Sequence, residues 1–404
     1  MVSRESQHRP PGSGEIEKLK SIVVNEINLR AAELSELARR IHANPELGFK
    51  EFHAAAWLAD YLETLGFAAE RGIARLPTAF KASFGKGRPA IAFLAEYDAL
   101  PEIGHACGHN LIATAAVGAA VGARLAAEHL GGQVAVFGTP AEEVYGGKAI
   151  MADRGAFADL DAAMLVHPDS ADIATAQALA CQGIVVEFIG KPAHAAARPE
   201  AGVNALDAML LSFAAINSLR QHIRPTARVH GIITDGGQAP NVVPAHSAAS
   251  FLVRARDDAY LDALKEKVLN CFIGAGVATG AELKYKWDDV RYATMRNNMT
   301  LARLYQQNMR PLKRNVLLTE ARQAFGSTDM GNVSHLVPSI QPYVAVARPG
   351  VLIHSPEFAA VAASEDGLKG MLDAAKAMAM TAVDLLSDPE MVKKARDEFE
   401  QGRK

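Results

Sequence analysis

The feature that most constrains the fold is a regular alternation of short apolar strands and helices in the first half of the chain. Pro89 to Ala95, Gln133 to Gly138 and Asp161 to Val166 each have the unbroken apolar pattern of a buried strand. An alanine-rich helical segment, Asn110 to Leu130, lies between the first two and ends at a Gly-Gly pair. Because strands separated by helices pair in parallel, the sequence predicts an α/β fold with a mixed, largely parallel sheet flanked by helices.

Polar residues follow these strands at their carboxyl ends. Asp98 lies just beyond the first strand, the pair Glu142 and Glu143 beyond the second, and His167 beyond the third. Late in the chain, another strand-like segment, Pro342 to Ile353, runs into His354. In open α/β sheets, ligands bind at the edge formed by the carboxyl ends of the strands. We therefore expect these side chains to gather on one rim of the sheet.

A second pattern begins near Gly183 and ends near Tyr292. Its strand-like and helical segments follow the order β-α-β-β-α-β, which is typical of a ferredoxin-like unit. A chain of 404 residues also exceeds the usual size of one hydrophobic core. We expect a flexible, polar tail at 1–20, a larger domain formed by 21–182 and 293–404, and a smaller inserted domain at 183–292.

Composition and charge argue against several classes of protein. The net charge is −3 and the basic residues are scattered, so we expect no nucleic-acid partner. Charges or Gly and Pro residues interrupt every apolar run, so we expect no membrane span. The three cysteines, Cys107, Cys181 and Cys271, are odd in number and far apart. This spacing argues against a disulfide framework and favours a reduced, cytoplasmic protein.

The densest group of candidate ligands is Cys107-Gly108-His109, at the start of the alanine-rich helix. A thiolate and an imidazole two positions apart can reach one metal ion, and a helix amino terminus favours the thiolate form. Taken alone, such a pair is more often a buried structural cysteine beside a surface histidine. The other residues on the rim decide whether Cys107 and His109 bind a metal ion or are structural.

Three other rim residues extend the candidate metal set: Glu143, His167 and His354. Two adjacent carboxylates, as at Glu142 and Glu143, repel each other unless a cation or a shared proton relieves them. One can bind a metal while the other transfers protons, although a lone Glu-Glu pair is usually a solvated loop. One thiol, three imidazoles and a carboxylate suit Zn, Mn, Ni or Co. Five ligands exceed the three or four of one catalytic zinc, so we expect two divalent metal ions per chain.

The motifs together resemble metallopeptidase family M20, which contains aminoacylase, carboxypeptidase G and the plant auxin-conjugate hydrolases. The resemblance is strongest to its Cys-Gly-His amidohydrolase branch, including aminobenzoyl-glutamate hydrolases and related dipeptidases. It extends from about Glu33 to Leu386, with the motifs in the order of the family. They are Glu96-Tyr97-Asp98-Ala99-Leu100-Pro101, His105-Ala106-Cys107-Gly108-His109-Asn110, Pro140-Ala141-Glu142-Glu143, His167-Pro168 and His354-Ser355-Pro356.

The resemblance implies a metal-dependent amidohydrolase or carboxypeptidase that cleaves an N-acyl or aminoacyl amino acid with metal-activated water. In this family Glu142 corresponds to the general base, and Asp98 to an acidic residue that supports the metal site. The implied metal ligands are Cys107, His109, Glu143, His167 and His354. The substrate is expected to be a small amide with a free carboxylate, such as aminobenzoyl-glutamate, a dipeptide or an N-acyl amino acid.

The same resemblance assigns roles to residues of the inserted domain. It implies a lid that also forms a homodimer interface, with His194 stabilising the oxyanion, in many relatives in the partner's active site. Asn241 and Arg254 resemble residues that hold the substrate carboxylate, and His230 lies in the same predicted sheet. Without the resemblance, His194 would be an exposed loop histidine and Arg254 part of a solvated sheet face.

Two positions depart from the pattern of relatives. Asn110 stands where much of the Cys-Gly-His branch has Asp, so we expect different hydrogen bonding around the ligands. Glu96 stands where aminopeptidase-like members have a ligating His, which leaves the identity of the metal open.

Two other classes of function compete with the metal-dependent hydrolase. In a cysteine amidase, Cys107 would be the nucleophile and His109 or His194 its base, which leaves Glu143, His167 and His354 without a role. A non-catalytic binding protein on the same fold would have no need of Glu142. Chelation distinguishes the first alternative, and a Glu142→Gln variant distinguishes the second.

Overall fold

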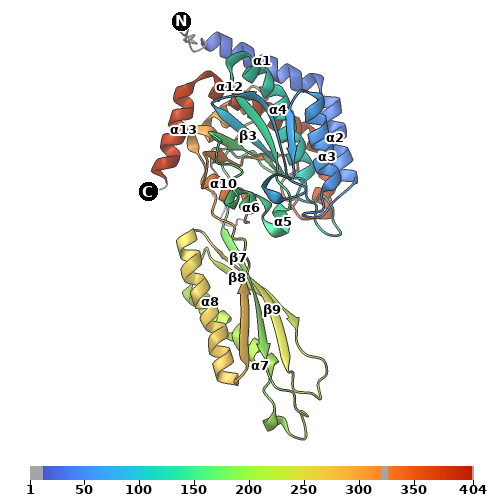
Figure 1. Ribbon diagram of the computed structural model, residues 1–404, viewed down its shortest axis with the longest axis vertical. Coiled ribbons are helices and arrows are strands. Elements are labelled where there is room, and N and C mark those ends of the chain that lie inside the picture. The colour runs from blue at the N-terminus through green and yellow to red at the C-terminus, as the bar shows by residue number, and fades with distance from the viewer. Residues whose placement is uncertain (1–11, 320–325, 403–404) are drawn as a thin grey trace. The chain divides into compact units, whose positions relative to one another are not determined.

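The computed structural model describes residues 12–319 and 326–402, which form two compact units (Figure 1). Of the described residues, the first unit contains 12–176, 295–319 and 332–402, and the second contains 177–294 and 326–331. The expected lid boundaries at 183 and 292 fall inside the second unit. The second unit is therefore built from two segments of the chain, the shorter of which comes from the region after residue 325.

A six-stranded sheet forms the centre of the first unit, in the order β1-β2-β4-β3-β5-β11. The pairs β1–β2 and β2–β4 are antiparallel, whereas β4–β3, β3–β5 and β5–β11 are parallel. Every residue of β3 is buried, as in a strand whose two faces are both covered. This sheet confirms the expected α/β class. Its strands are β1 (Ala68–Arg71), β2 (Phe80–Lys86), β3 (Ala90–Ala95), β4 (Gly132–Gly138), β5 (Ala162–Met164) and β11 (Ser339–Ile340).

The two long helices α4 and α12 pack against each other, and α1 packs against both. Small residues on α4 permit this: a Cβ at Gly118 would lie 3.1 Å from the Cβ of Ala375, and one at Gly122 2.8 Å from Cδ1 of Ile27. The helices of this unit are α1 (Ser13–Leu29), α2 (Ala31–Ala43), α3 (Phe52–Thr64), η1 (Ile73–Arg75), α4 (His109–Leu130), α5 (Glu142–Tyr145), α6 (Gly147–Asp153), α9 (Met299–Met309), α11 (Pro356–Val361), α12 (Glu365–Ser387) and α13 (Pro389–Gln401). A short helix, α10 (Met330–Ser334), begins at the end of the second unit's later segment.

The helix α4 is long and apolar enough to cross a membrane by length and composition alone. The expectation that no apolar run has this length was therefore wrong for His109–Leu130. In the structure, 89% of its most apolar window is buried inside the protein. Burial of this extent identifies α4 as the central helix of the hydrophobic core.

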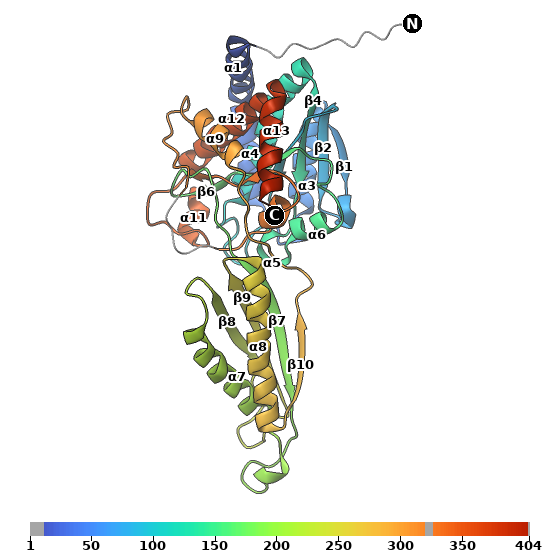
Figure 2. The ribbon, with the colours of Figure 1, turned by 90° about the vertical axis from the view of Figure 1, so that its left-hand side faces the viewer.

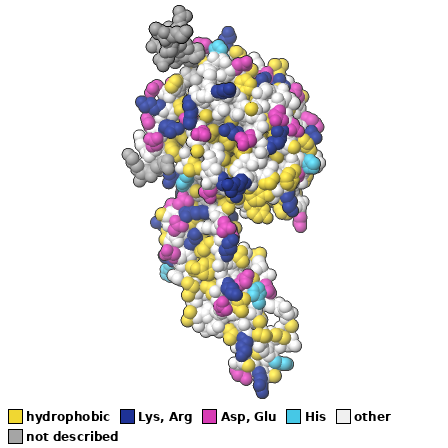
Figure 3. All heavy atoms as spheres, in the orientation of Figure 1, with side chains coloured by type: hydrophobic (Ala, Val, Ile, Leu, Met, Phe, Trp, Pro, Cys, Tyr) yellow, Lys and Arg dark blue, Asp and Glu magenta, His cyan; other side chains and the backbone are white. Residues whose placement is uncertain are grey.

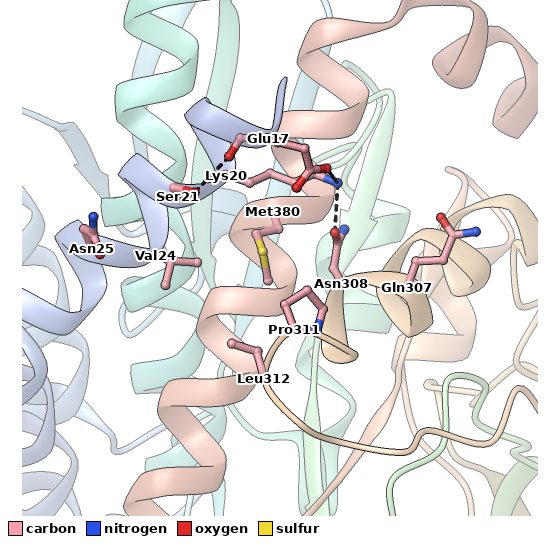
Figure 4. A pocket seen from close by; sticks show the side chains of 10 residues that line it. All are labelled: Glu17, Lys20, Ser21, Val24, Asn25, Gln307, Asn308, Pro311, Leu312 and Met380. Carbon is pink, nitrogen blue, oxygen red and sulfur yellow. Dashed lines mark hydrogen bonds and ion pairs between the residues drawn. The ribbon is translucent and has the colours of Figure 1, made fainter. Parts of the chain in front are cut away.

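The flexible tail expected at 1–20 is wrong for residues 13–20, because α1 begins at Ser13 and buries Leu19. Residues 1–11 lie outside the described residues. Lys20 in α1 lies 2.6 Å from the carboxylate of Asp384 in α12 and donates a hydrogen bond to Asn308 in α9 at 2.9 Å. Figure 4 shows Lys20 directed toward Asn308 across the hollow between these helices. The segment is polar in sequence because it forms ion pairs with its neighbours.

The end of the chain also differs from expectation. Of the strand expected at Pro342 to Ile353, only β12 (Tyr343–Ala345) forms, and it pairs in parallel with β6 (His167–Asp169). His354 therefore lies in a loop well beyond the strand. The helix α13 follows α12 and ends at Gln401.

The second unit is a four-stranded antiparallel sheet in the order β10-β7-β9-β8, with α7 and α8 packed together on it (Figure 2). In chain order this is 4-1-3-2, and it confirms the ferredoxin-like lid. Alternate residues of β7 such as Ile184, Val186 and Phe188 join one hydrophobic core with the two helices. The elements are β7 (Ala180–Ile189), η2 (Pro199–Ala201), α7 (Ala205–Leu219), η3 (Arg220–His222), β8 (Arg228–Asp235), β9 (His246–Ala255), α8 (Asp258–Thr279) and β10 (Glu282–Trp287).

Candidate metal centre

The predicted ligands come from four separate regions of the first unit. His109 is the first residue of α4, and Cys107 lies in the turn before it. Glu143 lies in α5, which follows the carboxyl end of β4. His167 is the first residue of β6, and His354 lies in the loop before α11. The structure therefore places all five in one unit, although they span most of the sequence.

The donor atoms of these five residues form two overlapping groups of three. Cys107, His109 and His167 are buried, and their donor atoms all lie within 4.8 Å of one another. Cys107, Glu143 and His354 form a second group within the same limit. Cys107 belongs to both, and its Sγ lies 3.4 Å from Nε2 of His167. Two groups that share one thiol fit a pair of adjacent metal ions better than a single ion.

Hydrogen bonds orient the two buried imidazoles. Nδ1 of His109 donates to the backbone oxygen of Asp98 at 2.8 Å and to its Oδ1 at 3.1 Å. Nδ1 of His167 donates to the backbone oxygen of Pro168 at 2.8 Å. Because a carbonyl only accepts, both rings carry the proton on Nδ1 and present the lone pair of Nε2. This is the tautomer that a metal ligand requires.

Two buried atoms of the centre lack a hydrogen-bond partner among the described residues: Nε2 of His109 and Oε1 of Glu143. Oε1 of Glu143 lies 3.3 Å from Nε2 of His354 and 3.8 Å from Nε2 of His109. Buried polar atoms of native proteins are normally paired, so a cluster of lone pairs of this kind is typical of a cation site. The residues present therefore fit the implied metal ions.

The backbone around the ligands is tightly constrained. Gly108 has φ +78°, and a Cβ at this position would lie 2.5 Å from Cγ of Pro168. Glycine is therefore required between Cys107 and His109, as the Cys-Gly-His spacing indicated. His354 and Ala141 also have positive φ values, of 63° and 58°, although both carry a Cβ. Such backbone conformations are uncommon outside glycine and occur often at functional sites.

Burial and neighbouring charges shift the pKa values of the centre. Burial raises the pKa of Cys107 well above its ordinary value, against the expectation that the helix terminus favours the thiolate. Burial alone would raise the pKa of Asp98, but His109 and the amide of Glu143 lower it. A thiolate at Cys107 therefore needs a cation beside it.

The predicted general base, Glu142, is buried at the first position of α5. One of its carboxylate oxygens lies within 4.8 Å of a ring nitrogen of His109 and a carboxylate oxygen of Glu143. Asp98 lies behind the ligands, since its second oxygen, Oδ2, accepts from the backbone amide of Glu143 at 3.0 Å. Asp98 thus contacts two predicted ligands through one carboxylate.

The two departures from the family pattern have structural explanations. Asn110 donates to the backbone oxygens of Ala362 at 2.8 Å and Ala38 at 3.3 Å, so it ties α4 to other helices and contacts no ligand. The expectation that hydrogen bonding around the ligands differs from that of relatives with Asp at this position stays a prediction. Oε1 of Glu96 lies 2.6 Å from Nζ of Lys148, and both side chains are buried. Sequence reasoning missed Lys148, whose only signal is a cation within the apolar start of α6.

The remaining candidates lie in the second unit. Nδ1 of His194 accepts from the amides of Ala196 and Ala197, which places the proton of the neutral ring on Nε2. The amide of Ala195 donates to the backbone oxygen of Asn241, so His194 and Asn241 belong to adjoining loops. The structure therefore brings these two residues to the same end of the sheet.

Arg254 and His230 lie together at the other end. Nη1 of Arg254 donates to Ser327 at 3.3 Å, and burial together with the charge of Arg254 lowers the pKa of His230. Asn241 precedes β9 and Arg254 is near its end, and β9 has ten residues. At 3.3–3.4 Å per residue they are separated by roughly 30 Å. Asn241 and Arg254 of one chain cannot hold the same carboxylate, as their shared assignment suggested.

Comparisons with known proteins identify relatives of this chain. Residues 181–275 match the M20 model described as peptidase dimerisation domain. The chain is 38% identical to the Xaa-Arg dipeptidase of Mus musculus, over 99% of this chain and 96% of that protein. It is 31% identical to a component of the p-aminobenzoyl-glutamate hydrolase of Escherichia coli, over 91% of this chain and 92% of that protein.

Solved structures share the fold. A dinuclear metal-binding peptidase of the M20 family from Bacillus subtilis matches with a TM-score of 0.69 and 20% identity, over 89% of this chain and 99% of that one. An aminohydrolase from methicillin-resistant Staphylococcus aureus matches with a TM-score of 0.76 and 20% identity, over 91% of this chain and 100% of that one.

Proposed function

The chain belongs to the M20 family of metallopeptidases, and from this we propose that it hydrolyses the amide bond of a dipeptide or N-acyl amino acid. The observation that carries the proposal is the pair of overlapping ligand groups that share Cys107, with Glu142 beside them. This arrangement suits the hydrolysis of an unactivated amide, which needs a strong nucleophile at neutral pH and a group that transfers its proton.

Two divalent ions of Zn, Mn, Ni or Co would be held by Cys107, His109, Glu143, His167 and His354. When bound, such ions acidify a water molecule and polarise the scissile carbonyl. The protein contributes the fixed tautomers of His109 and His167 and the buried carboxylate of Glu143. Asp98 keeps two of these ligands in place from behind.

Glu142 acts as the general base in the proposed reaction. It accepts a proton from the attacking water and donates it to the leaving nitrogen, which lets one carboxylate serve both steps. Its position next to His109 and Glu143 supports this role. Because Glu142 is buried, bulk water competes little for the same proton.

The substrate is proposed to carry a free carboxylate. The relatives are named for an Xaa-Arg dipeptide and for p-aminobenzoyl-glutamate, and both of these compounds have an amide bond to an amino acid with an α-carboxylate. Arg254 suits this group because a guanidinium binds a carboxylate through two parallel hydrogen bonds. His230 beside it would contribute a neutral hydrogen-bonding partner.

A homodimer through the second unit would complete the site. His194 and Asn241 lie at one end of the lid sheet and Arg254 lies at the other. In one chain, these two ends therefore cannot contact the same substrate molecule. We propose that His194 and Asn241 serve the active site of the partner chain, where Nε2–H of His194 stabilises the oxyanion. The match to a dimerisation domain supports this assembly.

We also propose a cytoplasmic enzyme that acts without nucleic-acid or membrane partners. The absence of a nucleic-acid partner is supported by the face of the protein in Figure 3, where basic side chains are interspersed with acidic ones. The absence of a membrane partner is supported by the buried position of α4. The reduced cysteines are compatible with this compartment.

The structure disfavours the two competing functions. A cysteine amidase requires a thiolate of lowered pKa, whereas burial raises the pKa of Cys107. A binding-only protein has no use for the buried Glu142 beside the ligands.

The test is metal content of the purified protein, with hydrolysis of dipeptides, N-acyl amino acids and p-aminobenzoyl-glutamate before and after chelation. Near two metal ions per chain, and activity that chelation removes and Zn, Mn, Ni or Co restores, would support the proposal. Activity that survives chelation but is lost on thiol alkylation would assign the chemistry to Cys107 instead.

A further inference from the structure

The loop of residues 44–51, before α3, packs against the segment that carries the general base. A Cβ at Gly48 would lie 3.0 Å from the Cβ of Ala141, and the ring of Phe49 stacks on that of Tyr145 at 5.2 Å. Oε1 of Glu51 accepts a hydrogen bond from the backbone amide of Ala141 at 2.8 Å. The loop thus contacts both ends of α5, through Ala141 before its first residue and Tyr145 at its last. Glu51 and Ala141 are 90 residues apart in the sequence.

Glu51 is an unusual residue for this position. Its carboxyl is fully buried, and its second oxygen, Oε2, has no hydrogen-bond partner among the described residues. Burying a carboxyl group in this way is unfavourable for stability. Such a group persists where its contact serves the function of the protein.

The residue that Glu51 holds is itself constrained. Ala141 has φ 58° and ψ 44°, a left-handed conformation that is unfavourable for a residue with a Cβ. This conformation turns the chain so that Glu142 begins α5, and the backbone oxygen of Ala141 then accepts from the amides of Tyr145 and Gly147 at 3.3 Å. On the other side of Glu142, the amide of Glu143 is held by Asp98.

We propose that Glu51 is a positioning residue for Glu142: its carboxyl holds the Ala141 peptide in the left-handed conformation that aims the base at the metal centre. Glu142 is thus flanked by two amides that are fixed by buried carboxyl groups, Glu51 on Ala141 and Asp98 on Glu143. The inference rests on the proposed function, since it gives Glu142 the role of the base.

The test compares Glu51→Leu, which removes the acceptor, with Glu51→Gln, which keeps a carbonyl oxygen at the same distance along the side chain. In Glu51→Leu, kcat should fall on the order of 10²-fold, the loss expected when a catalytic group is misplaced by about 1 Å. KM and metal content should stay within about twofold, since Asp98 still holds the amide of Glu143. Glu51→Gln should retain kcat to within about threefold.

Rescue and a matched control distinguish positioning from stability. Adding Ala141→Gly to Glu51→Leu should recover part of kcat, because glycine adopts positive φ without a Cβ penalty. Glu46 lies in the same loop, and its carboxylate accepts from the amides of His53 and Ala54, at the start of α3 and away from Ala141. Glu46→Ala should lower the melting temperature and leave kcat unchanged.

Three results would overturn the inference: wild-type kcat in Glu51→Leu, equal losses in Glu51→Leu and Glu51→Gln, or no rescue by Ala141→Gly. If the wild-type protein hydrolyses no amide, the proposed function fails and crystal structures of the variants still decide the inference. In Glu51→Leu, Ala141 should then leave the left-handed region and Glu142 should move. An unchanged Ala141 would reject the positioning role.

Discussion

The carboxylate of Asp98 accepts a hydrogen bond from Nδ1 of His109 at 3.1 Å, and its other oxygen accepts the amide of Glu143 at 3.0 Å. One side chain therefore fixes the ring of one ligand and the backbone of another. Because the pair of bonds needs two acceptor oxygens, only a carboxylate can make both. Asp98 thus links the end of β3 to α4 and α5, the two segments that contribute Cys107, His109 and Glu143.

The first prediction concerns this link. Asp98→Asn keeps one acceptor and replaces the other with an amide donor. Either the amide of Glu143 loses its partner, or His109 keeps only the backbone oxygen of Asp98. Metal affinity should fall about 10- to 100-fold, as for other residues that support metal ligands from behind. Competition with a chromophoric chelator measures this loss. Asp161→Asn, a buried carboxylate that contacts Ala90 and Arg396, is the control and should keep wild-type affinity.

The second prediction concerns the two ligand groups. His354 belongs to the group with Glu143, and His167 to the group with His109, whereas Cys107 belongs to both. His354→Ala and His167→Ala should therefore each retain about one metal ion per chain, and Cys107→Ala should retain almost none. Elemental analysis after gel filtration gives these ratios. Equal metal content in the three variants would contradict a shared thiol.

The third prediction separates catalysis from binding. Glu142→Gln has almost the same shape but cannot accept a proton at neutral pH, so kcat should fall about 10²- to 10⁴-fold. Metal content should remain that of the wild type, because Glu142 is not among the five proposed ligands. Steady-state kinetics on the best amide of the panel, with elemental analysis of the same sample, measures both quantities. A variant that turns over at the wild-type rate would remove Glu142 from the mechanism.

The sequence predicted the parts of the site that depend on residue type and strand order. Asp98, Glu143 and His167 could be placed on one rim because buried strands are recognisable and their carboxyl ends meet. His354 was identified by its motif, whereas the strand expected before it is mostly irregular chain. The separation of Asn241 from Arg254 follows from the ten-residue length of β9, which the order of elements alone does not give.

Residues that act through three-dimensional contacts were not predictable. Lys148 contacts Glu96, and Glu51 accepts from the amide of Ala141; no local pattern in the sequence marks such buried pairs. Residues 13–20 were misassigned for a similar reason. Hydrophobic periodicity reports apolar burial, whereas Lys20 is held by partners in helices near the other end of the chain.

The fourth prediction tests that N-terminal contact. Lys20→Met removes the cation 2.6 Å from Asp384, whose side chain is only 14% exposed, and should destabilise the protein by about 1–3 kcal/mol at pH 7.5. Burial already raises the pKa of Asp384 despite Lys20, so ionised Asp384 is a cost in the folded state. This cost is absent when Asp384 is protonated at low pH and appears as the pH rises through its folded pKa.

Without Lys20 the pKa of Asp384 should rise further, so the two proteins should differ most near neutral pH and converge as the pH falls toward 4. Urea unfolding at pH 4.5 and 7.5 measures the difference. Glu17→Gln is the matched control, because Glu17 is exposed and 3.8 Å from Lys20, and it should change stability by less than about 0.5 kcal/mol. A Lys20→Met variant with wild-type stability at pH 7.5 would show that the ion pair between Lys20 and Asp384 does not stabilise the fold. A loss of stability that is independent of pH would assign the effect to packing around Lys20 instead of to Asp384.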